Sequence, residues 1–171
     1  LIIMVGKPVM INHNTGITEW SVFLNQMETK KLAYILKEID GASGIGIFKI
    51  SYTEKGYQIN YKKSTREEVH KLLKKLNNYL VSAILSQAEY SNKLFPYSVN
   101  TVRLLTMIDP ENEEPFIAAA AHRIGNSMSS PVDNCALGGL TANIDITSGK
   151  LGKAVRTKVN NNRLDWFENH P

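Results

Sequence analysis

A short glycine-rich segment between two lysines is the first feature of this sequence that could do chemistry. Residues 40–46 read Asp-Gly-Ala-Ser-Gly-Ile-Gly and lie between two apolar runs, with Lys37 before them and Lys49 after them. Glycine lets backbone amides approach phosphate oxygens because no side chain blocks the way, and lysine adds positive charge. The segment matches neither of the two common glycine-rich phosphate-binding motifs. It therefore predicts either a phosphate-binding loop or an ordinary hairpin turn.

Two arginines inside apolar strands form a second candidate functional site. Arg103 lies near the start of one strand and Arg123 near the end of the next, and Asp133-Asn134 precedes Gly138-Gly139. A guanidinium group inside an apolar strand needs an anionic partner, because leaving it unpaired in a core is costly. The two arginines could therefore converge on one bound anion, or each could pair with a nearby Asp or Glu. The residues alone leave both interpretations open.

The elements that must position these residues differ between the two parts of the chain. In residues 1–79 we expect a short helix at 20–27, strands at 32–36, 47–50 and 57–61, and a longer helix that begins at Ser64 or Thr65. Both residues start a Ser/Thr-x-x-Glu capping box, and apolar residues follow at a spacing of three and four. Residues 80–171 read mainly as strands, at 81–85, 102–108, 116–122, 141–146 and 151–157, with an acidic hairpin turn at 109–115. We predict an α+β fold with a first lobe at 1–79 and a second at 80–171.

The composition of the chain limits the classes of protein to which it can belong. The chain has 171 residues, of which 43% are hydrophobic, and this is enough for a core. No apolar run approaches the roughly 20 residues that a membrane span needs, and no secretory signal is seen. The single cysteine, Cys135, allows no internal disulfide and fits a reducing compartment, so we expect a cytoplasmic protein.

Charge is unevenly distributed along the chain. Residues 1–79 hold 12 Lys and Arg against 7 Asp and Glu, whereas residues 80–171 hold 8 against 9. A basic lobe suits nucleic acid or a phosphate-bearing small ligand. Because no aromatic RNA-binding motif and no arginine-rich run accompanies the charge, we expect no nucleic-acid partner.

These motifs resemble a known superfamily. The pattern Leu36-Lys37-x-x-Asp40-Gly41-x-x-Gly44-x-Gly46 is similar to the lysine and glycine-rich lid of ATP-grasp proteins. One branch of that superfamily, the sugar-transfer-associated ATP-grasp proteins found with bacterial cell-surface polysaccharide genes, shares a longer series: Asn100-Thr101-x-Arg103, His122-Arg123-x-Gly125, Asp133-Asn134, Gly138-Gly139 and Ile144-Asp145-x-x-x-Gly149. The order Arg, Arg, Asn, Gly-Gly is also similar to that of glutamate-ligase-type ATP-grasp enzymes. The resemblance runs from about residue 30 to the end, and implies two α+β lobes with the nucleotide cleft between them.

The resemblance also implies roles for individual residues. Lys37 matches the lysine that contacts the nucleotide phosphates, and residues 80–86 would form the hinge strand against which the adenine lies. The loop that closes over the phosphates would contain Ser43, Gly44 and Gly46. Polar groups near adenine and ribose would be Gln87 and Glu89. The arginines near the transferred phosphoryl group and the acyl phosphate would be Arg103 and Arg123. The acceptor side would be lined by Asn134, Gly138 and Gly139.

The magnesium site is the main point at which this sequence departs from the superfamily. ATP-grasp enzymes bind Mg²⁺ through a late Asp, followed by a Glu and an Asn. After Asp145 this chain has only Asp165, Glu168 and Asn169, and no apolar strand frames them. We therefore expect the metal ligands beyond the end of this chain, a second lobe that is incomplete at its C-terminal end, and an inactive piece. A missing final strand would leave an open sheet edge, which predicts a homodimer.

The function that the resemblance implies is that of an ATP-dependent carboxylate–amine ligase. It would act through an acyl-phosphate intermediate in cell-surface polysaccharide biosynthesis, with ATP and Mg²⁺ as cofactors. Its partners would be a carboxylate and an amine acceptor, such as an amino acid or a sugar-linked group. A kinase-like or carboxylase-like transfer would use the same nucleotide residues. A different class, a non-catalytic nucleotide-binding or scaffold module of a polysaccharide machine, also stays open.

Overall fold

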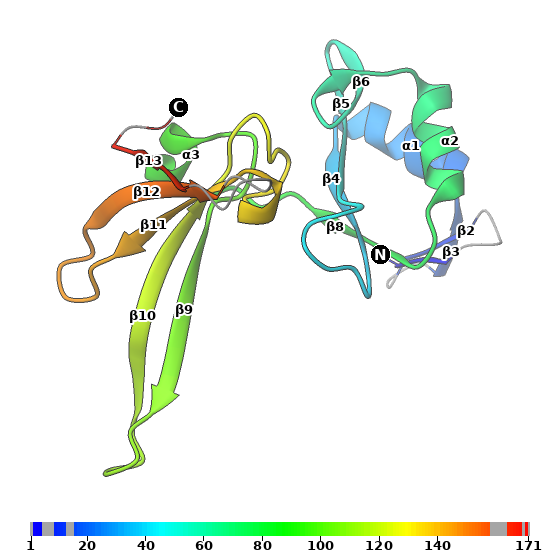
Figure 1. The fold of residues 1–171 in the computed structure, drawn as a ribbon. Coiled ribbons are helices and arrows are strands. Elements are labelled where there is room, and N and C mark those ends of the chain that lie inside the picture. The colour runs from blue at the N-terminus through cyan, green and yellow to red at the C-terminus, as the bar shows by residue number, and fades with distance from the viewer. Residues whose placement is uncertain (1, 5–8, 13–15, 158–163, 169, 171) are drawn as a thin grey trace. The chain divides into compact units, whose positions relative to one another are not determined.

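The computed structural model describes residues 2–4, 9–12, 16–157, 164–168 and 170. The chain divides into two compact units, unit 1 at Leu1–Leu85 and unit 2 at Ser86–Pro171 (Figure 1). Both units combine antiparallel sheet with a few helices, so the predicted α+β class is confirmed. No helix in the described part of the chain is long and apolar enough to cross a membrane.

Unit 1 contains one sheet and two helices. Among the described residues the sheet has eight strands in the order β3-β2-β1-β8-β4-β5-β6-β7. The strands are β1 (Ile2–Met4), β2 (Val9–Asn12), β3 (Gly16–Glu19), β4 (Ala33–Glu38), β5 (Phe48–Thr53), β6 (Gly56–Ile59), β7 (Lys62–Lys63) and β8 (Tyr79–Ala83). The helices are α1 (Trp20–Lys30) and α2 (Arg66–Lys75). Strand β8 lies between β1 and β4 and so belongs to unit 1, whereas we expected this segment to begin the second lobe.

Local sequence explains how the longer helix starts. Of the two candidate caps, Thr65 is the one that caps α2: its Oγ1 accepts a hydrogen bond from the Glu68 amide at 3.2 Å. The Glu68 carboxylate in turn accepts a hydrogen bond from the Thr65 amide at 2.8 Å. This reciprocal pair satisfies two backbone donors that the first turn of the helix would otherwise leave without partners.

The core of unit 1 lies between the helices and one face of the sheet. Side chains alternate along a strand, so Leu36 of β4 and Ile50 of β5 point to the helices and are fully buried. They pack against Met27 of α1 and Val69 of α2, which are also fully buried. Figure 1 shows both helices on one side of β4, β5 and β8. The opposite face of these strands is therefore left without a helix.

Unit 2 is a sheet with one short helix. Its strands are β9 (Thr101–Ile108), β10 (Pro115–Ile124), β11 (Leu140–Ile144), β12 (Leu151–Thr157) and β13 (Leu164–Phe167), in the order β13-β12-β11-β10-β9. Helix α3 (Glu89–Leu94) and a single 3₁₀ turn, η1 (Cys135–Leu137), complete the described elements. The predicted hairpin between β9 and β10 is confirmed. A small core of Phe95, Ile124 and Leu140 lies on the face that α3 covers.

Strand β13 corrects one expectation from the sequence. We expected no strand around Asp165, but this residue lies in β13 directly opposite Arg156 of β12. The two side chains form an ion pair at 3.0 Å, and the Arg156 guanidinium also lies 5.2 Å from the centre of the Phe167 ring. The strand was missed because four residues with a central charge give no apolar run. Asp165 and Arg156 are thus bound to each other across the two strands.

Candidate functional site

The helix-free face of unit 1 brings together the two lysines that flank the glycine-rich segment. Strand pairing places Lys49 of β5 opposite Ile35 of β4, and Lys37 lies two residues further along β4 on the same face. The two lysines are therefore diagonal neighbours across adjacent strands. Lys37 is exposed, whereas Lys49 is half-buried with its ammonium 4.0 Å from the centre of the Tyr61 ring. Burial lowers the pKa of Lys49.

The glycine-rich segment connects β4 to β5 and begins just after Lys37. Its backbone takes left-handed conformations at Ser43 (φ 59°), Gly44 (φ 75°) and Gly46 (φ 73°). At Gly46 a side chain would also collide, because a Cβ there would lie 2.8 Å from the Tyr79 hydroxyl oxygen. The segment is thus a hairpin connection, as one interpretation of the sequence predicted. Its place next to Lys37 keeps the phosphate-binding interpretation open as well.

The helix-free face of unit 2 carries the two candidate arginines. Strand pairing sets Arg103 of β9 opposite Ala121 of β10 and sets Arg123 of β10 opposite Thr101 of β9. Residues two apart on a strand share a face, so Arg103 and Arg123 lie on the same face as diagonal neighbours. This face is opposite the one that carries Ile124, Leu140 and α3.

A buried carboxylate distinguishes the two arginines. Asp133 is only 7% exposed, and its Oδ1 lies 2.9 Å from Nη2 of Arg123. Its Oδ2 accepts a hydrogen bond from the Thr101 amide at 2.9 Å and another from the Thr101 hydroxyl. Arg123 therefore pairs with a carboxylate, which was one of the two alternatives left open. Arg103 is exposed and forms no ion pair within the described part of the chain.

Asp133 is a site residue that we named only as part of a motif, without identifying it as the partner of Arg123. The available signal was the cost of an unpaired buried arginine, because that cost requires a carboxylate and Asp133 follows Arg123 by ten residues. What the sequence does not reveal is the path that brings the loop after β10 back across the sheet. Only the folded loop shows that Asp133 joins β9 to β10.

The predicted acceptor residues shape this returning loop. The Asn134 side chain caps η1 by accepting a hydrogen bond from the Ala136 amide at 2.7 Å. Gly138 has φ 97°, and its carbonyl accepts a hydrogen bond from the Asn126 side chain at 2.6 Å. A Cβ at Gly139 would lie 2.6 Å from the carbonyl oxygen of Asp133, so only glycine lets the backbone pass this close. All three residues thus fix the backbone of the loop that carries Asp133.

The two residues predicted near adenine and ribose have different surroundings. The Gln87 side chain donates to the Phe95 carbonyl at 2.9 Å and to Asn92, and it accepts from the Asn100 amide at 3.0 Å and from Ser91. These four bonds use the whole hydrogen-bonding capacity of the amide group. A contact with adenine would have to replace one of them. Glu89 is exposed and pairs with Lys93 at 2.7 Å.

His122 is the most enclosed titratable side chain of unit 2 that the structure describes. It is 2% exposed, its Nε2 lies 3.5 Å from the Tyr90 hydroxyl, and its Nδ1 has no hydrogen-bond partner among the described residues. Burial lowers the pKa of His122, and the negative charge of Asp133 offsets part of that effect. The net effect is a pKa below the ordinary value of histidine.

The described residues do not fit a magnesium site. They contain no group of three or more His, Cys, Asp or Glu side chains that could hold a metal ion. The Asp145 carboxylate accepts hydrogen bonds from the amide and the hydroxyl of Ser148, both at 2.7 Å, and these bonds lower its pKa. Glu168 pairs with Lys153, and Asn169 lies outside the described residues.

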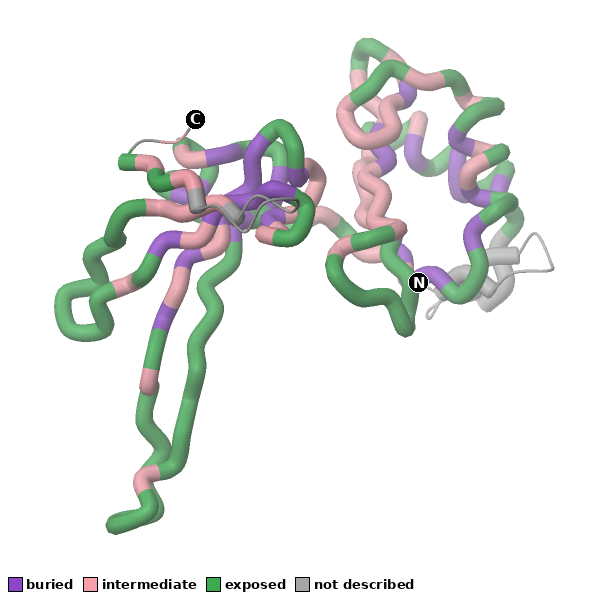
Figure 2. The backbone as a smooth tube through the Cα atoms, in the orientation of Figure 1, coloured by how far each residue is buried: buried purple, intermediate pink, exposed green. Residues whose placement is uncertain are grey.

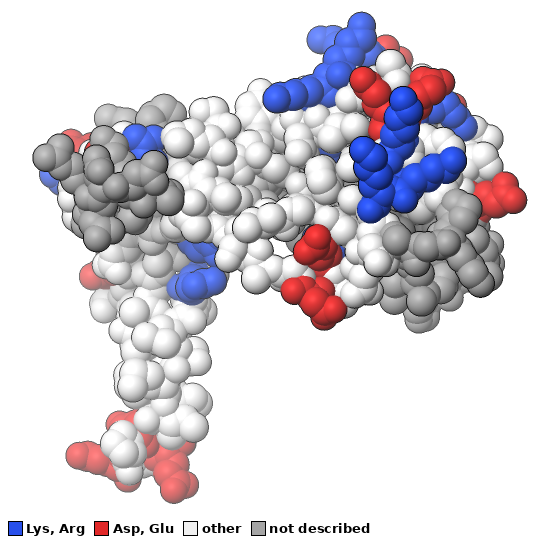
Figure 3. Space-filling model, turned by 45° about the vertical axis from the view of Figure 1, so that its right-hand side comes forward, with Lys and Arg blue, Asp and Glu red and all other residues white. Residues whose placement is uncertain are grey.

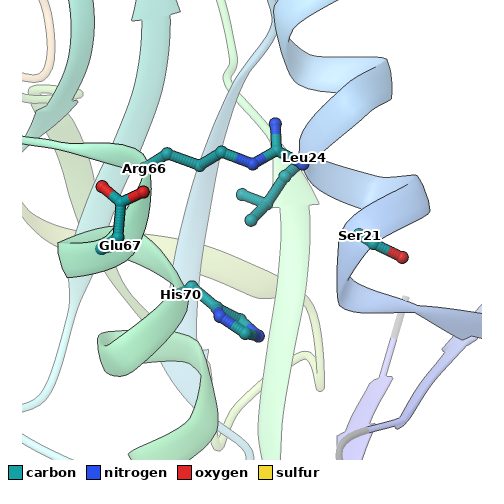
Figure 4. A pocket seen from close by; sticks show the side chains of 5 residues that line it. All are labelled: Ser21, Leu24, Arg66, Glu67 and His70. Carbon is teal, nitrogen blue, oxygen red and sulfur yellow. The ribbon is translucent and has the colours of Figure 1, made fainter.

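A pocket of about 160 Å³ lies between α1 and α2, on the side of the unit 1 sheet opposite Lys37. Figure 4 shows the side chains that line it, namely Ser21, Leu24, Arg66, Glu67 and His70. The Arg66 guanidinium pairs with Glu28 and donates to the Asn25 side chain at 2.7 Å. Its charge is therefore already used in joining the two helices, and this pocket offers no free cation.

Two α+β units with cations on their helix-free faces match the fold expected for an ATP-grasp protein. The chain matches the family model described as sugar-transfer associated ATP-grasp over residues 6–171. The chain therefore belongs to the sugar-transfer associated ATP-grasp family, as the sequence motifs predicted. Neither the curated proteins nor the solved structures gave a match. The roles of the individual site residues stay predictions.

Proposed function

We propose that this protein is an ATP-dependent carboxylate–amine ligase that acts through an acyl phosphate in cell-surface polysaccharide biosynthesis. Membership of the family supports the ATP-dependent, ligase-like part of this proposal. The phosphoryl-transfer part of the proposal is supported by one observation: the helix-free face of each unit presents an exposed cation next to a second cation. These pairs are Lys37 with Lys49 and Arg103 with Arg123.

In this proposal the lysines of unit 1 bind the nucleotide phosphates. Lys37 is exposed and can present its three N–H donors to phosphate oxygens, while Lys49 is fixed by its contact with Tyr61. The loop residues Ser43, Gly44 and Gly46 lie next in the chain and would add backbone amides. Fixed donors of this kind stabilise the charge of a phosphoryl group without reorganisation during the reaction.

The two arginines have different roles in this proposal. Arg103 supplies net positive charge to the transferred phosphoryl group, since it has no carboxylate partner among the described residues. Arg123 forms a neutral pair with Asp133, and its remaining N–H donors can orient an oxygen of the acyl phosphate. A substrate carboxylate oxygen attacks the γ-phosphorus and ADP leaves. An amine nitrogen then attacks the acyl carbon, and phosphate leaves as the amide forms.

Magnesium has no assigned place in this scheme. The family binds ATP with Mg²⁺, but the described residues form no metal site. The chemistry that remains for this chain is positioning and charge neutralisation by its lysines and arginines.

The test is release of ADP and phosphate from Mg-ATP with a panel of amino acids and amino sugars. Release that depends on both a carboxylate and an amine, and that Lys37→Ala abolishes while Lys74→Ala does not, would establish a ligase. Lys74 is the matched control because it is an exposed lysine of α2, on the helix side of the unit 1 sheet. A stable phosphorylated acceptor without amide formation would instead indicate a kinase-like transfer.

The second candidate is a nucleotide-binding or scaffold module without catalysis. The cations that would bind the nucleotide phosphates, Lys37 and Lys49, would serve this candidate equally well. Calorimetric binding of ATP with no ADP release across the whole panel would support this candidate and would reject the ligase.

A further inference from the structure

The hairpin of β9 and β10 exposes apolar side chains on both of its faces. Residues 102–119, which we call the arm, are green along almost their whole length in Figure 2. On one face Leu104 is 52% and Ile108 68% exposed, and on the other Leu105 is 56% and Met107 52% exposed. Two strands alone are marginally stable in water, and contiguous exposed apolar surface of this kind marks an interface.

Beyond Thr101, whose amide is bound by Asp133, the outer edge of β9 has no strand beside it among the described residues. Strand β9 is the last strand of its sheet, has eight residues, contains no proline, and carries a single charged residue, Arg103, near its start. The other edge strands that the structure describes are shorter: β7 has two residues, both lysines, and β3 and β13 have four residues each. A long apolar edge without such protection is a template for pairing with another strand.

The acidic turn at the tip of the arm decides the direction of that pairing. Asp109, Glu111, Glu113 and Glu114 lie within six residues, and Figure 3 shows the acidic side chains together at the end of the apolar arm. Parallel arms would bring two such tips side by side. Antiparallel arms separate the tips by the length of β9, on the order of 27 Å, which exceeds the Debye length of about 8 Å. Charge therefore favours the antiparallel arrangement.

We propose that β9 pairs with β9 of a second copy of this chain, antiparallel and about a two-fold axis near Leu104 and Leu105. The same edge then serves both copies, so the contact closes as a dimer and leaves no β9 edge free. The arm becomes four strands wide instead of two, and the rows of leucine and methionine continue across the junction. This inference is independent of the proposed function, and it places the dimer contact at β9 rather than at the C-terminal edge.

The first test measures molar mass by light scattering over a dilution series. We expect a dimer that Leu104→Lys weakens about tenfold or more, because the two-fold axis brings the substituted positions of both copies together and like charges oppose pairing. Ile117→Lys is the matched control, since it removes a similarly exposed apolar side chain from β10, away from the edge. We expect the control to leave the dimer unchanged.

The second test locates the contact directly and does not depend on the stability of the lysine variant. Leu104→Cys and Leu105→Cys are introduced singly into a Cys135→Ser background and oxidised. At least one of them should form a disulfide-linked dimer, whereas Glu113→Cys at the tip should not. Efficient linkage through Glu113→Cys would show parallel arms and overturn the proposal.

Three further results would also overturn it. A monomer at every concentration would show that the edge stays free. Open-ended assembly instead of a dimer would show that β9 pairs with a different edge. A dimer that dissociates in high salt would indicate that the acidic turn binds exposed lysines of its partner, because apolar strand pairing is not weakened by salt.

Discussion

At the scale of single residues, Asp133 makes two similar arginines different. Arg103 and Arg123 share a face of the unit 2 sheet, but only Arg123 has a buried carboxylate at 2.9 Å. The same carboxylate accepts hydrogen bonds from Thr101 and so joins β9, β10 and the returning loop. Positive charge on this face therefore belongs to Arg103, while Arg123 contributes hydrogen bonds in a fixed orientation.

Replacing Asp133 tests that assignment. We expect Asp133→Asn to lower the free energy of unfolding by about 3 kcal/mol, because it leaves the Arg123 guanidinium without its counter-charge. Urea unfolding followed by circular dichroism measures the loss. Glu168→Gln removes a carboxylate from an exposed pair with Lys153 and should cost less than about 0.5 kcal/mol. Equal losses in the two variants would show that Asp133 does not hold Arg123.

Lys37 is predicted to contribute directly to nucleotide affinity. We expect Lys37→Ala to weaken ATP binding by about 1 to 3 kcal/mol, which is the range for a charge-assisted hydrogen bond to phosphate. Lys74→Ala should leave the affinity unchanged, because Lys74 lies on α2 on the other side of the sheet. Isothermal titration calorimetry distinguishes these outcomes, and negligible losses in both variants would contradict the prediction.

His122 makes the stability of the protein depend on pH. Its pKa is below the usual 6.5 in the folded state because of burial, so protons bind the unfolded chain more readily. The contribution of neutral His122 to the free energy of unfolding is fully present above pH 6.5. It is lost as the pH falls from there through the lower pKa of the folded state. We expect His122→Phe, which keeps a ring beside Tyr90, to flatten the dependence of unfolding free energy on pH between 7 and 5. An unchanged slope would mean that other groups cause it.

At the scale of elements, the N-terminus of α2 shows that only one of two residues that match the capping pattern forms the cap. Ser64 and Thr65 both fit the capping box, yet only Thr65 forms it. Thr65→Ala should lower the free energy of unfolding by about 1 kcal/mol. Ser64→Ala should change it far less, since the Ser64 hydroxyl donates only to the exposed Lys62 carbonyl at 3.3 Å. Denaturant titration of the two variants decides which residue caps the helix in solution.

Elements with strong local signals could be predicted, and those held by distant contacts could not. The helix after Thr65 and the β9–β10 hairpin follow from a capping box and from an acidic turn between apolar strands. Helix α3 has only six residues and no side-chain cap, and much of its support comes from Gln87 and Asn100. Strand β13 depends on the pair between Arg156 and Asp165, which no local pattern reveals.

At the scale of the whole molecule, the two units repeat one plan. The antiparallel sheet of unit 1 has two helices on one face and that of unit 2 has α3, and each sheet presents cations on its other face. The sequence predicted two α+β lobes and the candidate cations, because alternating strands and glycine-rich turns are local features. The partner of Arg123 was beyond prediction, since it depends on how closely Gly139 lets the chain pass Asp133.

The diagonal arrangement of Lys37 and Lys49 has a thermodynamic consequence. Two like charges on neighbouring strands attract the same anion, so an anion that contacts both lysines binds the folded chain, in which the strands are paired, better than the unfolded chain. A ligand that binds only the folded chain raises its stability in proportion to RT ln(1 + [L]/Kd). Inorganic triphosphate should therefore raise the midpoint of thermal unfolding, measured by calorimetry against sodium chloride of equal ionic strength. The rise should be smaller in Lys37→Ala, and an equal rise would mean that the anion stabilises the fold from another surface.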